Sequence, residues 1–168
     1  MALKADRNEL DVDISIFMNE TAEKGQIVAV STAGSGAAMD QSQALVSIQG
    51  ATGSVIPVGV LLNDVVDIDL TRQHINWHKD EGQKGGKVSI LKKGYVVTDH
   101  IEGTPTAGAI AFLDDADTGK FAMAASVADT KYSPVGRFMS IKDEDGYCKV
   151  EVNLPVPMNK ADAAGTDV

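Results

Sequence analysis

Short runs of alternating apolar and polar residues, separated by glycine-containing breaks, limit the fold of this chain more than any other feature. Residues 12–18 read VDISIFM, and their apolar positions fall on one face: Val12, Ile14, Ile16 and Met18. Successive side chains of a strand point to opposite faces, so a period of two predicts strands with one buried face. Further apolar runs of strand length lie at residues 26–30, 44–48, 55–62, 63–70, 87–92, 95–101, 109–113, 120–124, 135–141 and 147–154.

The breaks between these runs predict tight turns and an all-β fold. Asp145-Gly146 separates the last two runs, and Asp-Gly between alternating runs is a strong hairpin signal. Helical periodicity is confined to one short alternative at residues 15–23. We therefore expect a small barrel or sandwich of short antiparallel strands. The expected divisions are an N-terminal arm or strand at 1–20, a barrel domain of one unit or two similar halves at 21–155, and a mobile tail at 156–168.

Two parts of the chain share a layout. A glycine-led strand at 25–30 is followed by Pro57-Val58-Gly59, and a second at 108–113 is followed by Pro134-Val135-Gly136. Proline cannot donate to a β-ladder, so it suits a strand start or an edge. Glycine two residues later allows a bulge or a sharp bend. We interpret Pro57, Gly59, Pro134 and Gly136 as the same barrel corner used twice; the alternative is coincidence in a chain rich in valine and glycine.

The charge of the chain argues against nucleic acid as a direct partner. The formal net charge is −9, whereas phosphate binding requires clustered cations. The nearest cluster, Lys84, Lys87, Lys92 and Lys93, is interleaved with glycine and suits a strand edge that avoids pairing. No apolar run approaches the roughly 20 residues of a spanning helix, and no secretory signal is apparent. We expect no membrane partner and assembly in a reducing cytoplasm.

Residues that could support catalysis do not form a recognisable motif. His74 and His78 are four residues apart but lack the His-Glu-x-x-His pattern of zinc enzymes, and His100 stands apart. The single cysteine, Cys148, lies in an alternating run and cannot form a disulfide within the chain. We therefore expect no enzyme, no metal and no cofactor.

Aspartates occur in two groups, Asp64, Asp67 and Asp69, and Asp114, Asp115 and Asp117. The second group lies in DDADTGK, which lacks the closing glutamate of a calcium loop and is explained by hairpin-turn chemistry. An enzyme of the small β-barrel type would have to use Asp64 or Asp114. A fibre or adhesin-like β module is the other alternative, with Trp77, Tyr95, Tyr132 and Tyr147 as the aromatic side chains available to stack on a sugar.

The layout resembles that of the decoration, or cement, proteins on the heads of tailed bacteriophages. Those proteins carry a glycine-led apolar strand, a Pro-x-Gly strand, and a late Val-Gly-Arg strand followed by an alternating C-terminal strand. The matching segments here are 25–30, 57–62, 134–139 and 150–154, and the opening segment 9–25 is also similar. The resemblance covers about residues 9–154. The Trp77 loop and the acidic C-terminal tail have no counterpart.

The resemblance implies a structural protein that binds the outer surface of a phage head and stabilises the shell. Its partners would be the major capsid protein and further copies of itself, with a homotrimer expected first and a homodimer second. The apolar segment at the N-terminus would either pair with a neighbouring sheet or pack on its own barrel. The residues of this candidate interface with a subunit or the capsid are Val12, Ile14, Ile16, Phe17 and Met18.

Overall fold

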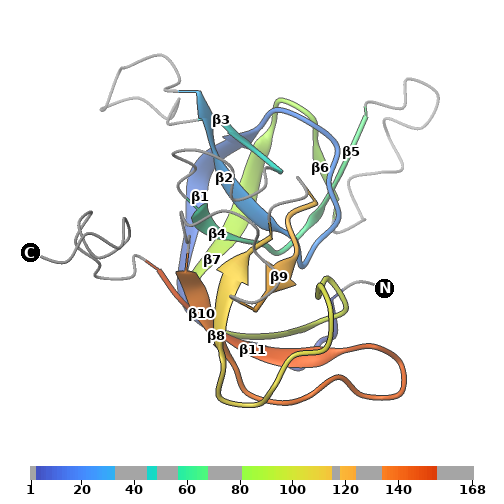
Figure 1. Ribbon diagram of the computed structural model, residues 1–168. Coiled ribbons are helices and arrows are strands. Elements are labelled where there is room, and N and C mark those ends of the chain that lie inside the picture. The colour runs from blue at the N-terminus through green and yellow to red at the C-terminus, as the bar shows by residue number, and fades with distance from the viewer. Residues whose placement is uncertain are drawn as a thin grey trace, which may run out of the picture.

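The computed structural model describes residues 3–32, 45–48, 57–67, 81–114, 118–123 and 134–154, and within these ranges the protein is all-β, without a helix (Figure 1). This confirms the predicted all-β class. The strands are β1 (Asn8–Met18), β2 (Ile27–Thr32), β3 (Leu45–Ser47), β4 (Pro57–Leu61), β5 (Asp64–Val66), β6 (Glu81–Gln83), β7 (Lys87–Thr98), β8 (Ile110–Leu113), β9 (Phe121–Ala122), β10 (Pro134–Phe138) and β11 (Cys148–Asn153).

Nine of these strands form one mixed sheet in the order β1-β3-β2-β4-β7-β11-β10-β8-β9. The pairing of β1 with β3 is parallel, and the other pairings in this sheet are antiparallel. Because β1 also pairs with β7, the strands β1, β3, β2, β4 and β7 form a closed circuit of hydrogen-bonded neighbours. Strands β5 and β6 form a separate two-stranded parallel sheet.

Strand β7 joins the two parts of the molecule. Figure 1 shows β1 to β6 in the upper part of the view and β8 to β11 in the lower part, with β7 running between them. One edge of β7 pairs with β1 from Lys87 to Tyr95. Its other edge is shared, because β4 pairs at Ile90 and Leu91 and β11 pairs from Lys93 to Thr98. Both halves of the sheet are therefore built on the same strand.

The sequence predicts two strands where the structure has the single strand β7. Gly94 does not end the strand but adopts a φ of 145° inside it. A Cβ atom at this position would lie 1.9 Å from the carbonyl oxygen of Asn8. The glycine thus allows β1 to cross close to β7, a known role of glycine within strands. The alternative helical turn at residues 15–23 is also absent, because β1 continues to Met18.

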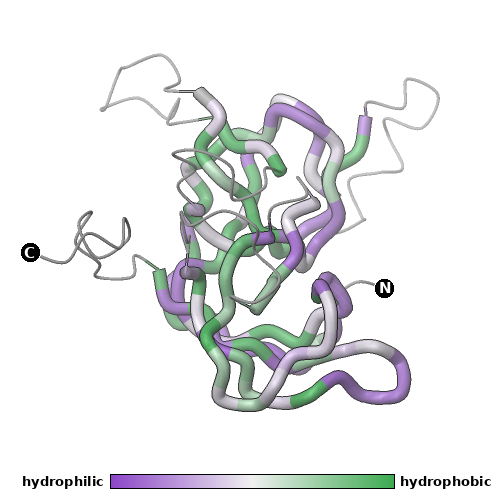
Figure 2. The backbone as a smooth tube through the Cα atoms, viewed as in Figure 1, coloured by the Kyte–Doolittle hydropathy of each residue, from purple (hydrophilic) through white to green (hydrophobic). Residues whose placement is uncertain are grey.

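Two hydrophobic clusters lie on opposite sides of the central strands. Alternate residues of β2 and β4 enter different clusters: Ile27 and Val60 pack in the first, and Val28 and Leu61 pack in the second. Strand β7 does the same, with Leu91 in the first cluster and Ile90 in the second. These strands are apolar on both faces, which explains their continuous apolar runs. Figure 2 shows that the apolar residues follow the strands.

The repeated layout has the same register in both copies. Strand β2 pairs with β4 through Ile27–Val60, Val28–Gly59 and Ala29–Pro57. Strand β8 pairs with β10 through the corresponding residues, Ile110–Arg137, Ala111–Gly136 and Phe112–Pro134. In each copy the register is irregular next to the proline pair. The shared layout therefore extends from the sequence to the hydrogen-bonded backbone.

The turns that lead into these strands also correspond. The amide of Gly25 donates to the carbonyl oxygen of Leu61, and the amide of Gly108 donates to the carbonyl oxygen of Phe138, each at 2.7 Å. Each acceptor lies four residues after the proline of its repeat. The two glycines have φ values of 95° and 88°. Coincidence in composition would not reproduce the register, the turn conformation and the hydrogen bonds together, so the two segments are structural equivalents.

The second glycine of each repeat lies against the neighbouring strand. A Cβ at Gly59 would be 2.7 Å from the carbonyl oxygen of Leu91, and one at Gly136 would be 1.8 Å from that of Glu151. Backbone atoms cannot move aside as a flexible side chain can, so each position requires glycine. The Pro-x-Gly pattern thus reports the close approach of β4 to β7 and of β10 to β11.

We predict that Gly136→Ala lowers the free energy of unfolding by about 1–3 kcal/mol, the usual cost of overpacking. The matched control is Gly82→Ala, where a Cβ would meet its nearest atoms at an ordinary 3.6 Å; we expect its effect to stay within about 0.5 kcal/mol. Urea denaturation of the three proteins measures both values. Equal stabilities for the two variants would contradict the required close approach at Gly136.

Candidate interaction surfaces

The five residues predicted as an N-terminal interface lie on β1 and differ in exposure. Ile16 and Met18 are buried at 6% and 0% exposure in the second cluster, whereas Ile14 is 64% exposed. Val12 is half-buried against the first cluster, and Phe17 is half-buried. The expected single apolar face is thus interrupted at Ile14, because the pairing with β7 shifts register between Asp13 and Ile16. Strand β1 packs on its own sheet, and its role as an interface stays a prediction.

An ion pair fixes β1 to β7 within this irregular stretch. The carboxylate of Asp13 accepts a hydrogen bond from Lys92 and a second, at 2.8 Å, from the amide of Ser15. Burial raises the pKa of Asp13, but the hydrogen bonds from Lys92 and Ser15 outweigh it and hold the pKa at about 2. The charged form of Asp13 is therefore favoured by folding.

The outer side of the lower half forms a sheet face that we call the β10–β11 face. The inward positions of β11 are Cys148, Val150 and Val152, so the residues between them point outward. Two adjoining grooves of about 350 and 490 Å³ run over this face and share Met139, Glu151 and Asn153. The residues that line the two grooves are Asn8, Leu10, Lys93, Gly94, Tyr95, Ile110, Pro134, Gly136, Arg137, Met139, Lys149, Glu151, Val152 and Asn153.

The β10–β11 face combines exposed apolar side chains with positive charge. Leu10, Ile110 and Met139 are 68%, 50% and 51% exposed. The charged residues of the face are the cations Lys93, Arg137 and Lys149 and the anion Glu151. Three positive charges and one negative charge give a local balance of +2 on a chain of net charge −9.

Lys149 is held in place on this face. Its ammonium group lies 3.7 Å from the centre of the Tyr95 ring, at cation–π distance. The contact orders a long side chain before any partner binds, which reduces the entropy lost on association.

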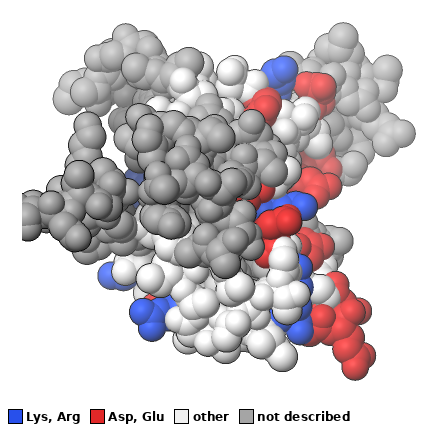
Figure 3. Space-filling model, in the orientation of Figure 1, with Lys and Arg blue, Asp and Glu red and all other residues white. Residues whose placement is uncertain are grey.

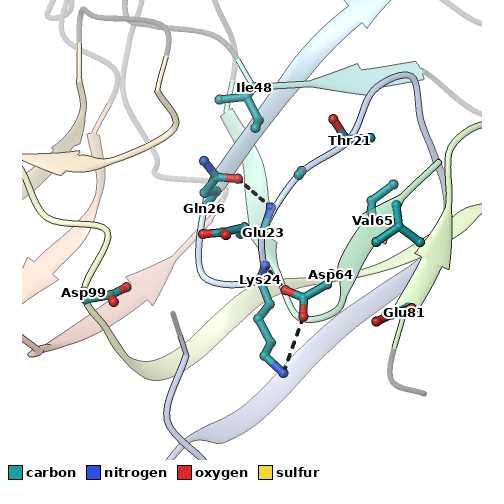
Figure 4. Close-up of a pocket in the computed structure, with 11 residues that line it drawn as sticks. Thr21, Glu23, Lys24, Gln26, Ile48, Asp64, Val65, Glu81 and Asp99 are labelled. Carbon is teal, nitrogen blue, oxygen red and sulfur yellow. Dashed lines mark hydrogen bonds and ion pairs between the residues drawn. The ribbon is translucent and has the colours of Figure 1, made fainter. Parts of the chain in front are cut away.

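A second surface, which we call the acidic depression, has the opposite charge. This open hollow of about 770 Å³ is lined by Glu23, Asp64, Glu81 and Asp99, with Lys24 as the one cation among its described residues (Figure 4). Four negative charges and one positive charge give a local balance of −3. In Figure 3 acidic side chains gather along the right-hand side of the described surface, on the side where β5 and β6 lie in Figure 1.

Local hydrogen bonds shape the wall of the acidic depression. The amide of Lys24 donates to the carboxylate of Asp64 at 2.9 Å, and its ammonium group lies 3.9 Å from the same carboxylate. The amide of Glu23 donates to the side chain of Gln26 at 2.8 Å. The carboxylate of Glu23 points outward and is 70% exposed. Asp64 therefore serves the local fold, while Glu23 is available to a partner.

Among the described residues, the two aspartates considered for catalysis, Asp64 and Asp114, are not brought together. Asp64 lines the acidic depression and Asp114 does not. Asp114 is 1% exposed, accepts a hydrogen bond from Thr118 across its turn, and has a pKa raised by burial. His100 lies 3.5 Å from Glu23, and burial lowers its pKa. Cys148 is buried, and burial raises the pKa of its thiol.

The other candidate positions fall outside the part of the chain that the structure describes: His74, Trp77, His78, Asp69, Asp115, Asp117 and Tyr132. Among the described residues, no group of three or more histidines, cysteines and carboxylates could hold a metal ion. Within the same ranges no helix is long and apolar enough to cross a membrane.

Sequence patterns did not identify the exposed apolar residues of the β10–β11 face. Leu10 precedes the predicted strand at 12–18 by two residues, and alternation would place it on the face of Val12. The pairing with β7 shifts register between Glu9 and Asp11 and again between Asp11 and Val12, so Leu10 is exposed. A bulge of this kind leaves no regular mark in a single sequence.

These observations define a class first: an all-β protein with exposed apolar and charged surfaces and with no metal-binding cluster among its described residues. The comparison with protein families identifies the group within that class. The family described as structural cement protein (E217 gp24/Pam3 gp6), a phage family, matches residues 7–153, from just before β1 to the end of β11. The chain belongs to this family, which confirms the resemblance found in the sequence. No curated protein matches the chain.

The Asp13–Lys92 pair predicts how stability changes with pH. The pKa of Asp13 is about 2 in the folded protein, against an ordinary value of 3.8. The pair therefore stabilises the fold at pH values above 3.8, and this stabilisation is lost as the pH falls through about 2. Both side chains are partly exposed, at 22% and 31%. Allowing for solvent screening, we expect Asp13→Asn to cost about 1 kcal/mol at pH 7 and nothing near pH 2.

Urea denaturation at the two pH values measures this difference. The control is Asp11→Asn, which removes an exposed carboxylate from the same strand and should behave as the wild type. If Asp13→Asn and the wild type lost equal stability on acidification, the pair would not be the source of the pH dependence.

Proposed function

We propose that this protein binds the outer surface of an assembled phage head and stabilises the shell without catalysing a reaction. The observation that carries the proposal is the match to a family of structural phage cement proteins, which spans nearly every described residue. The partners are the major capsid protein and further copies of this chain, as a homotrimer first and a homodimer second. Nucleic acid, membrane and cofactor have no part in this role.

We further propose that the circuit of β1, β3, β2, β4 and β7 closes as a small barrel, in which β1, from the expected N-terminal segment 1–20, completes the strands of the 21–155 domain. The circuit of pairings supports this, since a closed sheet has no free edge for unwanted pairing. Pro57, Gly59, Pro134 and Gly136 would then lie at its bends and at the equivalent bends of the lower half. A rigid body of this kind suits a protein that must resist deformation on a shell under internal pressure.

Binding to the assembled shell stabilises the assembled state, because a ligand that binds only one state shifts the equilibrium toward it. Repeated contacts on a lattice strengthen this effect by multivalency. The protein should therefore bind intact heads far better than isolated capsid-protein subunits. It would be made in the host cytoplasm and remain on the outside of the virion.

The direct test adds the purified protein to heads that lack it. We expect saturable co-sedimentation with heads, no binding to isolated capsid-protein subunits, and a higher temperature of shell disruption. Heads that neither bind the protein nor gain stability would overturn the proposal. A saturable sugar ligand in a glycan screen would favour an adhesin-like module instead.

A second test addresses the predicted interface on β1 with a matched pair of variants. Ile14→Ser changes an exposed side chain, so we expect an unchanged thermal midpoint and reduced occupancy on heads. Ile16→Ser introduces a hydroxyl at a buried position and should lower the unfolding free energy by about 2 kcal/mol or more. Thermal unfolding and co-sedimentation are measured on both. Full occupancy by Ile14→Ser would remove Ile14 from the interface.

A further inference from the structure

We propose that the β10–β11 face of one copy docks on the acidic depression of a second copy, so that the copies associate head to tail. The proposal rests on the proposed function for the expectation of self-association and deepens it by naming the two surfaces. Both surfaces belong to the same chain, and among the described residues they share none. Both surfaces of one copy can therefore be occupied together.

Charge decides which surfaces meet. Two β10–β11 faces would oppose one another with a balance of +2 each, and two acidic depressions with −3 each, so symmetrical pairing of either surface is repulsive. Opposite surfaces attract, and complementary charge gives specificity and steers association. The cations on the face are Lys93, Arg137 and Lys149, and the carboxylates in the depression are Glu23, Asp64, Glu81 and Asp99.

Apolar contact also favours the pairing of the β10–β11 face with the acidic depression. Leu10, Ile110 and Met139 are each at least half exposed on the face. Ile48, which is partly buried, supplies apolar surface at the depression, and Figure 4 shows it among the residues around the hollow. Burying exposed apolar area at the centre of a contact, with charged groups around it, is the usual arrangement of a protein interface.

A head-to-tail contact has a defined consequence for assembly. Contacts between two different surfaces generate a ring when the rotation closes and an open chain when it does not. A capsid decoration with local rotational symmetry requires the closed form. The contact proposed here is thus compatible with a trimer, whereas a twofold dimer would need both surfaces to lie in one patch, so that each meets its counterpart twice.

The experiment exchanges charges on the full-length protein. The face variant is Lys93→Glu with Arg137→Glu, and the depression variant is Glu23→Lys with Asp99→Lys; all four residues are exposed. We expect each variant to dissociate at least tenfold more readily than the wild type by analytical ultracentrifugation at low salt. The variant that carries all four changes should regain the association, because its surfaces are again complementary with reversed signs. Thermal midpoints confirm that each variant is folded.

The control, Lys84→Glu with Lys87→Glu, makes the same change in net charge at the exposed turn before β7 and should associate as well as the wild type. A monomeric wild type, an undiminished face variant, or a fourfold variant that stays dissociated would overturn the proposal. A face variant that associates normally but no longer binds heads would instead assign this face to the capsid. If a dissociated variant still bound heads, the proposed function would stand. If the fourfold variant regained association but did not bind heads, only the proposed function would be overturned.

Discussion

The pairing of β7 with β1 is the interaction on which the rest of the structure depends. Strand β1 covers one edge of β7 for most of its length, which leaves the other edge for β4 and β11 in succession. The two halves of the molecule thus share a backbone ladder as well as buried side chains. A disturbance of β7 would be felt in both hydrophobic clusters, since Ile90 and Leu91 enter different ones. The halves are coupled for this reason, and the first cluster takes residues from both of them.

Each of the two Pro-x-Gly segments packs its own strand closely against a neighbouring strand of the sheet. Gly59 brings β4 against the carbonyl of Leu91 on β7, and Gly136 brings β10 against that of Glu151 on β11. On their other sides, β4 pairs with β2 and β10 pairs with β8 in the same register. Each half of the molecule therefore contains an equivalent three-stranded unit. Similar local solutions at two places explain how a chain with few aromatic residues builds two small cores that support each other.

The sequence was sufficient to predict the repeat and the strands other than β6 (Glu81–Gln83), because these depend on local chemistry: alternation, turn glycines and the missing amide of proline. It could not predict that Gly94 lies within a strand, since the reason is the close passage of Asn8, a residue distant in the chain. It also misplaced Ile14, because register shifts in β1 depend on the pairing partner. The exposed face formed by Leu10, Ile110 and Met139 was missed for the same reason, as its members come from strands that only tertiary pairing brings together.

Charge is unevenly distributed over the surface of the protein, and this distribution favours some contacts over others. A chain with net charge −9 would repel its own copies if the charge were spread evenly, and such repulsion keeps proteins apart in solution. Here the local balance is reversed on the β10–β11 face, where a cation–π contact also orders Lys149. A structural protein that must find defined neighbours on a crowded lattice benefits from this arrangement, because contacts with the wrong orientation are repelled and contacts with the right one are attracted. Ile14 lines neither surface, so the proposed contact leaves this exposed side chain of β1 free to meet a different partner.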